Sequence, residues 1–144
     1  MKRNLIGILS LVVMTVLISA TGAYAQSYVK ANVPFEFKVG SAQLPAGTYE
    51  IKVDNASAGA IMIRNGQTNA GAMATARRES PRNTSAKLVF DHVGDQYFLA
   101  EIWRGSDSEG MIVPTSKQEK ELKKELKLAN GPSSGVEEVI VALN

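Results

Sequence analysis

The stretch that decides the fold is Lys87–Arg104, which reads KLVFDHVGDQYFLAEIWR. Two runs rich in aromatic and aliphatic residues, 87–93 and 96–104, flank the dipeptide Gly94-Asp95. Aromatic and β-branched residues favour strands, and a Gly-Asp pair between two such runs is typical of a two-residue hairpin turn. The stretch therefore predicts a β-hairpin.

A two-residue turn also fixes the register of this hairpin. It places His92 opposite Tyr97, and strict alternation then assigns the other side chains to two faces. Both faces carry bulky apolar groups, so we expect a central hairpin that is covered on both sides. One face is predicted to hold Leu88, Phe90, His92, Tyr97, Leu99, Glu101 and Trp103, and the other Lys87, Val89, Asp91, Phe98, Ala100 and Ile102.

The segments before and after the hairpin are also strand-like. Val29–Val39 has an apolar residue at every odd position, and Pro34 interrupts the run. Because proline lacks a backbone donor, the run predicts an edge strand or a break between two strands. Short strands separated by turn signals predict a mainly β fold, an antiparallel β-sandwich or small barrel-like domain. Further strands are expected at 48–54, 60–64, 70–76, 111–113 and 136–143.

One amphipathic helix is predicted near the C-terminus, at about 117–129. Ser116 followed by Glu119 is a capping-box pattern, and strong helix formers follow it. Glu121 and Glu125 alternate with lysines at spacings that place opposite charges near one another. The apolar stripe is too thin for firm membrane binding, and the polar face carries glutamates as well as lysines. We therefore favour a helix that covers an edge or open end of the sheet.

The first 25 residues carry the pattern of a signal peptide. Lys2 and Arg3 form a basic head, and the segment 5–18 is uncharged and mostly apolar. Ala23-Tyr24-Ala25 supplies small residues at the two positions that a signal peptidase reads. The apolar run is short for a membrane-spanning helix, which needs about 20 apolar residues. An uncleaved membrane anchor is the alternative.

We expect cleavage between Ala25 and Gln26. The mature chain, 26–144, would be a single β-rich domain in the periplasm or outside the cell, with no integral membrane span. Removal of the signal lowers the 16 Lys and Arg residues to 14, equal to the 14 Asp and Glu residues. A net charge near zero gives no support for nucleic-acid binding, and it does little to oppose self-association.

The hairpin holds the candidate site residues. His92 is the single histidine and the chain has no cysteine, so we expect no metal site, and we expect no cofactor. The functional interpretation is a ligand pocket lined by Tyr97 and Trp103, with His92 and Glu101 as its polar groups. The structural interpretation, which we favour, is a core hairpin whose histidine hydrogen-bonds Tyr97 or the backbone.

The only basic cluster is Arg77, Arg78 and Arg82, in a polar segment. These side chains could contact an anionic surface, but no aromatic residues lie between them to stack on bases. An ordinary exposed loop is the favoured interpretation.

Four motifs follow one another in a recognisable order. Val33–Gly40 (VPFEFKVG) precedes Leu44–Tyr49 (LPAGTY), then Gly94–Leu99 (GDQYFL) and Trp103, and a charged helix follows. This order resembles an uncharacterised family of small exported bacterial β-rich proteins over about residues 29–128. The resemblance implies a β-rich exported domain. It brings no known activity, cofactor or catalytic residue.

These observations predict a non-enzymatic, exported binding or structural accessory domain of the bacterial envelope. Its partner would be an envelope protein or a small ligand. The first alternative is a carrier of a small apolar ligand, with a pocket beside the 87–104 hairpin. The second is a minor hydrolase that uses His92 with a carboxylate or a serine.

Overall fold

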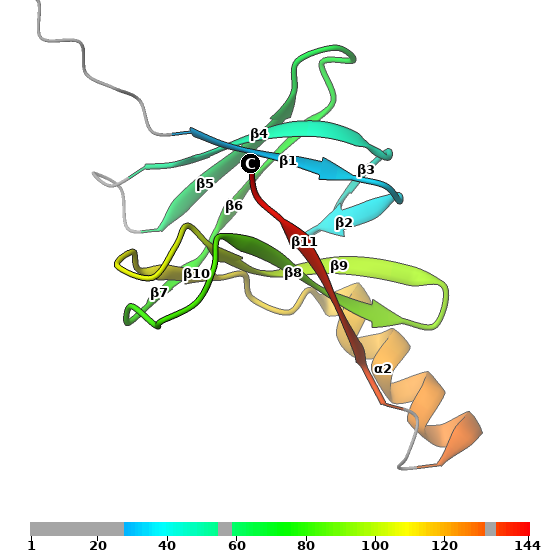
Figure 1. Cartoon of the computed structure of the whole chain (residues 1–144). Helices are drawn as coiled ribbons and strands as arrows, with labels where there is room; N and C mark the ends of the chain where they lie inside the picture. The colour runs from blue at the N-terminus through cyan, green and yellow to red at the C-terminus, as the bar shows by residue number, and fades with distance from the viewer. Residues whose placement is uncertain (1–27, 55–58, 132–134) are drawn as a thin grey trace, which may run out of the picture.

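The computed structural model describes residues 28–54, 59–131 and 135–144 of the 144-residue chain. Two β-sheets face one another, and one helix, α2 (Lys117–Asn130), lies at the far side of the second sheet (Figure 1). The predicted mainly β fold with one C-terminal helix is confirmed, and the sheets curl into a half-barrel. The predicted signal peptide lies outside the described residues.

The first sheet has four antiparallel strands in the order β1-β4-β5-β6. They are β1 (Tyr28–Val33), β4 (Gly47–Val53), β5 (Ala60–Asn65) and β6 (Gly71–Thr75). Alternate side chains of these strands point into the core, as the period of two predicts. The buried residues of this sheet include Ala31, Val33, Tyr49, Ile51, Ile61 and Ile63.

The second sheet is built around the predicted hairpin of β8 (Lys87–Val93) and β9 (Gln96–Trp103). β11 (Glu137–Ala142) pairs with β8, while β10 (Gly110–Ile112) joins β9 to β7 (Arg77–Glu79). All of these pairings are antiparallel. The hairpin is therefore central, with a partner strand on each side.

Two short strands extend the edge of β9 beyond β10. β2 (Phe37–Val39) pairs with β3 (Ala42–Leu44) and runs parallel to β9, with Lys38 opposite Phe98. The chain leaves β1 before Pro34 and enters β2 after it. The predicted break between two strands is thus correct, and it moves the chain from the first sheet to the second.

The two sheets are also joined at both of their edges. Near one edge β6 runs into β7 through Ala76, whose N–H donates to the Gly59 carbonyl at 2.7 Å. A Cβ on Gly59 would lie 1.8 Å from the Ala76 oxygen, so this close approach requires glycine. At the other edge Ala31 of β1 bridges Leu143, which follows β11. These links give the sandwich its barrel-like curl.

The helix begins and ends close to the predicted limits. Ser116 is its N-cap, and its hydroxyl accepts a hydrogen bond from the Glu119 N–H at 3.1 Å. At the other end Gly131, with φ 78°, donates to the Lys127 carbonyl. Both ends therefore satisfy backbone groups that a helix otherwise leaves unpaired.

Candidate functional site

A β-bulge interrupts the central hairpin. Phe90 pairs with Leu99, but the preceding residue of β8, Val89, pairs with Glu101. Ala100 is therefore an extra residue on β9, and side-chain alternation shifts by one position there.

The bulge separates the four predicted site residues into two pairs. His92 and Tyr97 lie on the face of the hairpin that meets the core between the sheets. Beyond the bulge Ile102 takes the core position, so Glu101 and Trp103 turn to the outer face. The expectation that all four share one face is wrong, because a regular alternation was assumed past Ala100.

Trp103 has a packing role on the outer face. Its side chain is 1% exposed, and its indole N–H donates to the Glu101 carboxylate at 2.6 Å. The Arg82 guanidinium lies over the ring at 5.1 Å from the centroid. A Cβ on Gly110 would lie 2.5 Å from the indole, so the ring fills the space that this glycine leaves. The buried indole N–H therefore has a hydrogen-bond partner two residues away on the same strand.

Tyr97 lies in a stack of three rings. His92, its partner across the hairpin, stacks on it with 4.3 Å between centroids, and Phe35 stacks with 4.0 Å. Phe35 comes from the segment just before β2, on the other side of β9 from β8. His92 Nδ1 also lies 3.4 Å from the Glu137 carboxylate on β11. The histidine is therefore held by a ring on β9 and a carboxylate on β11.

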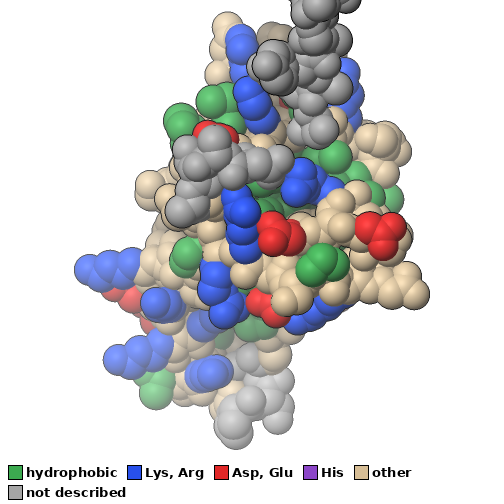
Figure 2. Space-filling view, turned by 90° about the vertical axis from the view of Figure 1, so that its left-hand side faces the viewer, with side chains coloured by type: hydrophobic (Ala, Val, Ile, Leu, Met, Phe, Trp, Pro, Cys, Tyr) green, Lys and Arg blue, Asp and Glu red, His purple; other side chains and the backbone are tan. Residues whose placement is uncertain are grey.

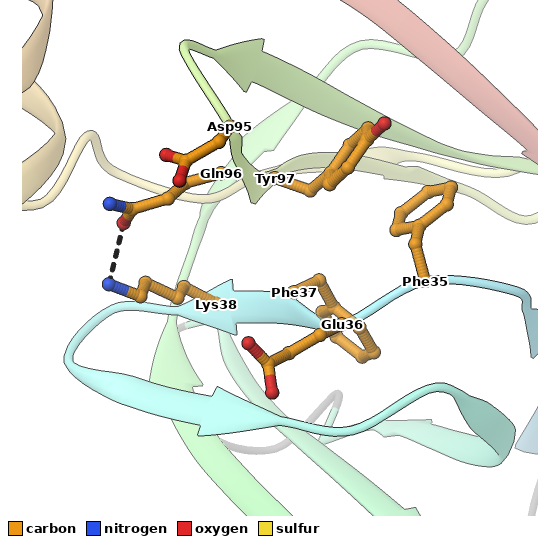
Figure 3. A pocket seen from close by; sticks show the side chains of 7 residues that line it. All are labelled: Phe35, Glu36, Phe37, Lys38, Asp95, Gln96 and Tyr97. Carbon is orange, nitrogen blue, oxygen red and sulfur yellow. Dashed lines mark hydrogen bonds between the residues drawn. The ribbon is translucent and has the colours of Figure 1, made fainter.

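A pocket of about 160 Å³ lies beside this stack (Figure 3). Two segments far apart in the sequence line it, 35–38 and 95–97. Lys38 Nζ donates to the Gln96 side-chain oxygen at 2.6 Å and so joins the two segments across the pocket (Figure 3). The ammonium also lies 5.8 Å from the centre of the Phe98 ring. Of the four predicted site residues, Tyr97 lines this pocket.

The pocket has an aromatic end and a polar end. Figure 3 shows Phe35 and Tyr97 at one end, and Asp95 and Gln96 at the other, where the β8–β9 turn lies. Glu36 adds a second carboxylate, which accepts a hydrogen bond from Gln43 at 2.6 Å. An amide, carboxylates and an ammonium can together orient a small polar group through hydrogen bonds.

A partly buried charged cluster lies beneath α2, and the sequence did not predict it. Lys123 Nζ is 2.6 Å from the Glu119 carboxylate and 2.8 Å from that of Asp91 on β8. Glu119 is 4% exposed, and burial raises the pKa of its carboxyl although the bond to Lys123 opposes the shift. Burial lowers the pKa of Lys123, but its two carboxylate partners outweigh burial and leave that pKa raised. The cluster fixes α2 to the sheet.

The arginine cluster is balanced by acidic neighbours. Arg77 and Arg82 both pair with Glu79, at 3.5 and 3.4 Å, and Arg78 pairs with Glu109 at 3.5 Å. The predicted exposed loop is wrong for Arg77 and Arg78, which lie in β7 and pair with β10. The ion pairs are exposed and support an ordinary surface role for the cluster.

Within the described ranges, no three His, Cys, Asp or Glu side chains gather where they could hold a metal ion. No helix in the same ranges has the length and apolar character needed to cross a membrane. Comparisons with family models, with curated proteins and with solved structures give no match. Fold and site define a mainly β, two-sheet protein with a small pocket that is partly aromatic and partly polar.

Proposed function

We propose that this protein is an exported, non-enzymatic accessory domain of the bacterial envelope that binds a partner through the pocket between β2 and the β8–β9 turn. The observation that carries the proposal is the convergence of two segments on one site. Lys38 and Gln96, 58 positions apart in the chain, are hydrogen-bonded across it. Convergent polar groups beside an aromatic wall are typical of recognition sites.

The size of the pocket favours a partner's side chain over a free ligand. Pockets for drug-sized ligands measure about 300–1,000 Å³, whereas this pocket measures about 160 Å³. A single side chain that projects from a protein partner fits such a volume, and anchors of this kind dominate many interfaces. The structure thus gives less support to a carrier of small apolar ligands.

A hydrolase is the second candidate, and one contact favours it. His92 Nδ1 lies 3.4 Å from the Glu137 carboxylate, the arrangement that orients a histidine base. Glu137 is an exposed side chain, however, and the histidine ring is stacked on Tyr97. Measurable turnover that is lost in a folded His92→Ala variant would establish the enzyme.

Export is supported by the signal-peptide pattern and by the family resemblance. It can be tested by expressing the full chain in its own host and measuring the intact mass of the protein in the exported fraction. A mature chain that begins at Gln26 supports the proposal. Full-length chain retained in the cytoplasm or the inner membrane would contradict it.

Partner binding can be tested by placing a photo-crosslinking residue at Gln96, on the rim of the pocket. Thr48, exposed on β4, serves as the matched control position. We expect a discrete envelope product from Gln96 that is lost when Asp95→Arg is added, and no such product from Thr48. Identical products from both positions would contradict the assigned surface. Native mass spectrometry that finds a small bound molecule would instead favour the carrier.

A further inference from the structure

One side of α2 is rich in lysine. The sequence predicts that Glu121 and Glu125 lie near lysines, and Glu121 does pair with Lys117 at 3.9 Å. Glu125 takes part in none of the ion pairs of the described residues. The lysine-rich side forms an open surface of the helix. It is lined by Lys120, Lys123, Lys124, Lys127 and Leu128.

Three of these lysines have no acidic partner among the described residues. The ion pairs of α2 there are those of Lys117 with Glu121 and of Lys123 with Glu119 and Asp91. Lys120, Lys124 and Lys127 take part in none of them. Lys120 and Lys124 are four residues apart, a spacing at which like charges destabilise a helix. All three lysines are exposed, so their ammonium groups are accessible to a partner.

Exposed apolar side chains accompany the lysines. Leu128, in the last turn of α2, is 79% exposed, and Val136, just before β11, is 39% exposed. Figure 1 shows the end of α2 and the start of β11 reaching together beyond the two sheets. We refer to Lys120–Leu128 with Val136 as the arm. The arm combines three lysines that have no acidic partner among the described residues with exposed apolar surface. Exposed carboxylates flank it at Glu121, Glu125, Glu137 and Glu138.

The opposite side of the molecule has a different character. Figure 2 shows the face at the left of Figure 1, where acidic side chains lie among the basic and hydrophobic ones. The arginines of β7 and of the segment that follows it have acidic partners, as described above. The arm differs from this arginine segment in that three of its lysines have no acidic partner among the described residues.

We propose that the arm docks on an anionic lipid surface. The three unpaired lysines would contact headgroup phosphates, while Leu128 and Val136 enter the interface between headgroups and acyl chains. Peripheral binding of this type combines electrostatic attraction with a small buried apolar area. A small apolar area then suffices for membrane binding, because the lysines supply the electrostatic attraction to the headgroups. This inference is independent of the pocket and of the partner proposed for it.

Co-sedimentation with lipid vesicles tests the proposal on the protein purified from its own host. The probes are vesicles of phosphatidylcholine alone and of phosphatidylcholine mixed with phosphatidylglycerol. We expect binding to the anionic vesicles that weakens as salt is added. The triple variant Lys120→Gln/Lys124→Gln/Lys127→Gln should lose affinity on the order of 100-fold. Leu128→Ser should weaken binding without any change in charge.

The matched control is Lys30→Gln/Lys52→Gln/Arg64→Gln, on the outer face of the first sheet. It removes the same net charge and should bind vesicles nearly as well as the wild type. The arm variants should keep the wild-type circular dichroism spectrum, because the substituted side chains are exposed. The same spectrum checks that the control variant is folded. Equal losses in the two triple variants, or equal binding to neutral and anionic vesicles, would overturn the proposal. Binding to soluble poly-aspartate but not to vesicles would overturn it in favour of an acidic protein partner.

Discussion

His92 and Tyr97 stack almost parallel across the β8–β9 hairpin, with 4.3 Å between ring centroids and 9° between ring planes. Tyr97 in turn stacks on Phe35, which reaches β9 from the segment before β2. The Tyr97 ring thus connects the hairpin to the segment that crosses from the first sheet. It also forms part of the pocket wall. The single histidine of the chain belongs to this packing.

We therefore expect His92→Ala to destabilise the protein by about 1 kcal/mol, the value typical of an aromatic pair beyond its buried area. The measurement is urea unfolding followed by tryptophan fluorescence. His92→Phe keeps the stacking and removes the contact with Glu137. Because Glu137 is exposed, its contact with His92 contributes little. If the phenylalanine variant proved as unstable as the alanine variant, stacking would not be the cause.

The sequence predicted those features that short segments determine. The Gly94-Asp95 turn fixed the register at its own end, and His92 does lie opposite Tyr97. The alternation of Val29–Val39 and the break at Pro34 were likewise local signals. The helix was recognisable from its capping residues and its composition.

The features that the sequence did not predict depend on contacts between segments far apart in the chain. The bulge at Ala100 has no local sequence signal, yet it moves Glu101 and Trp103 to the other face. The bond of Lys123 to Asp91 spans 32 positions and requires α2 to lie on the sheet. The pocket likewise requires the 35–38 segment to reach β9, which periodicity alone does not reveal.

The fit of Trp103 against Gly110 gives a second prediction. A methyl group at Gly110 would lie 2.5 Å from the indole ring, so Gly110→Ala forces the buried ring to move. We expect a loss of about 2 kcal/mol in the free energy of unfolding, within the range for overpacked cores. Gly66→Ala is the control, since no atom lies within 4 Å of its added methyl. Similar losses in both variants would show that the effect comes from the backbone.

The buried carboxyl of Glu119 gives a third prediction, on pH. Burial raises its pKa above the ordinary value of 4.5, so the folded state holds this proton more tightly than the unfolded state does. The resulting stability is complete below pH 4.5 and is lost as pH rises through the raised pKa. Wild type should therefore lose stability relative to Glu119→Gln across this window, as measured by urea unfolding at a series of pH values. A difference that does not vary with pH would contradict the assignment.

Lys123 titrates at the other end of the pH scale. Although burial lowers the pKa of its ammonium, the carboxylates of Asp91 and Glu119 outweigh burial and raise that pKa above 10.5. Its stabilising contribution should therefore be complete below pH 10.5 and disappear as pH rises through the higher folded-state pKa.

Lys123→Met tests this contribution because it leaves two carboxylates together beneath α2. We expect a loss of about 2 kcal/mol near neutral pH, less than for a fully buried pair because the lysine is partly exposed. The difference from wild type should shrink at high pH, where wild type also loses the charge. Lys127→Met is the matched control, since Lys127 has no ion pair among the described residues, and it should leave stability nearly unchanged. If the two variants behaved alike, the cluster would not be what fixes α2 to the sheet.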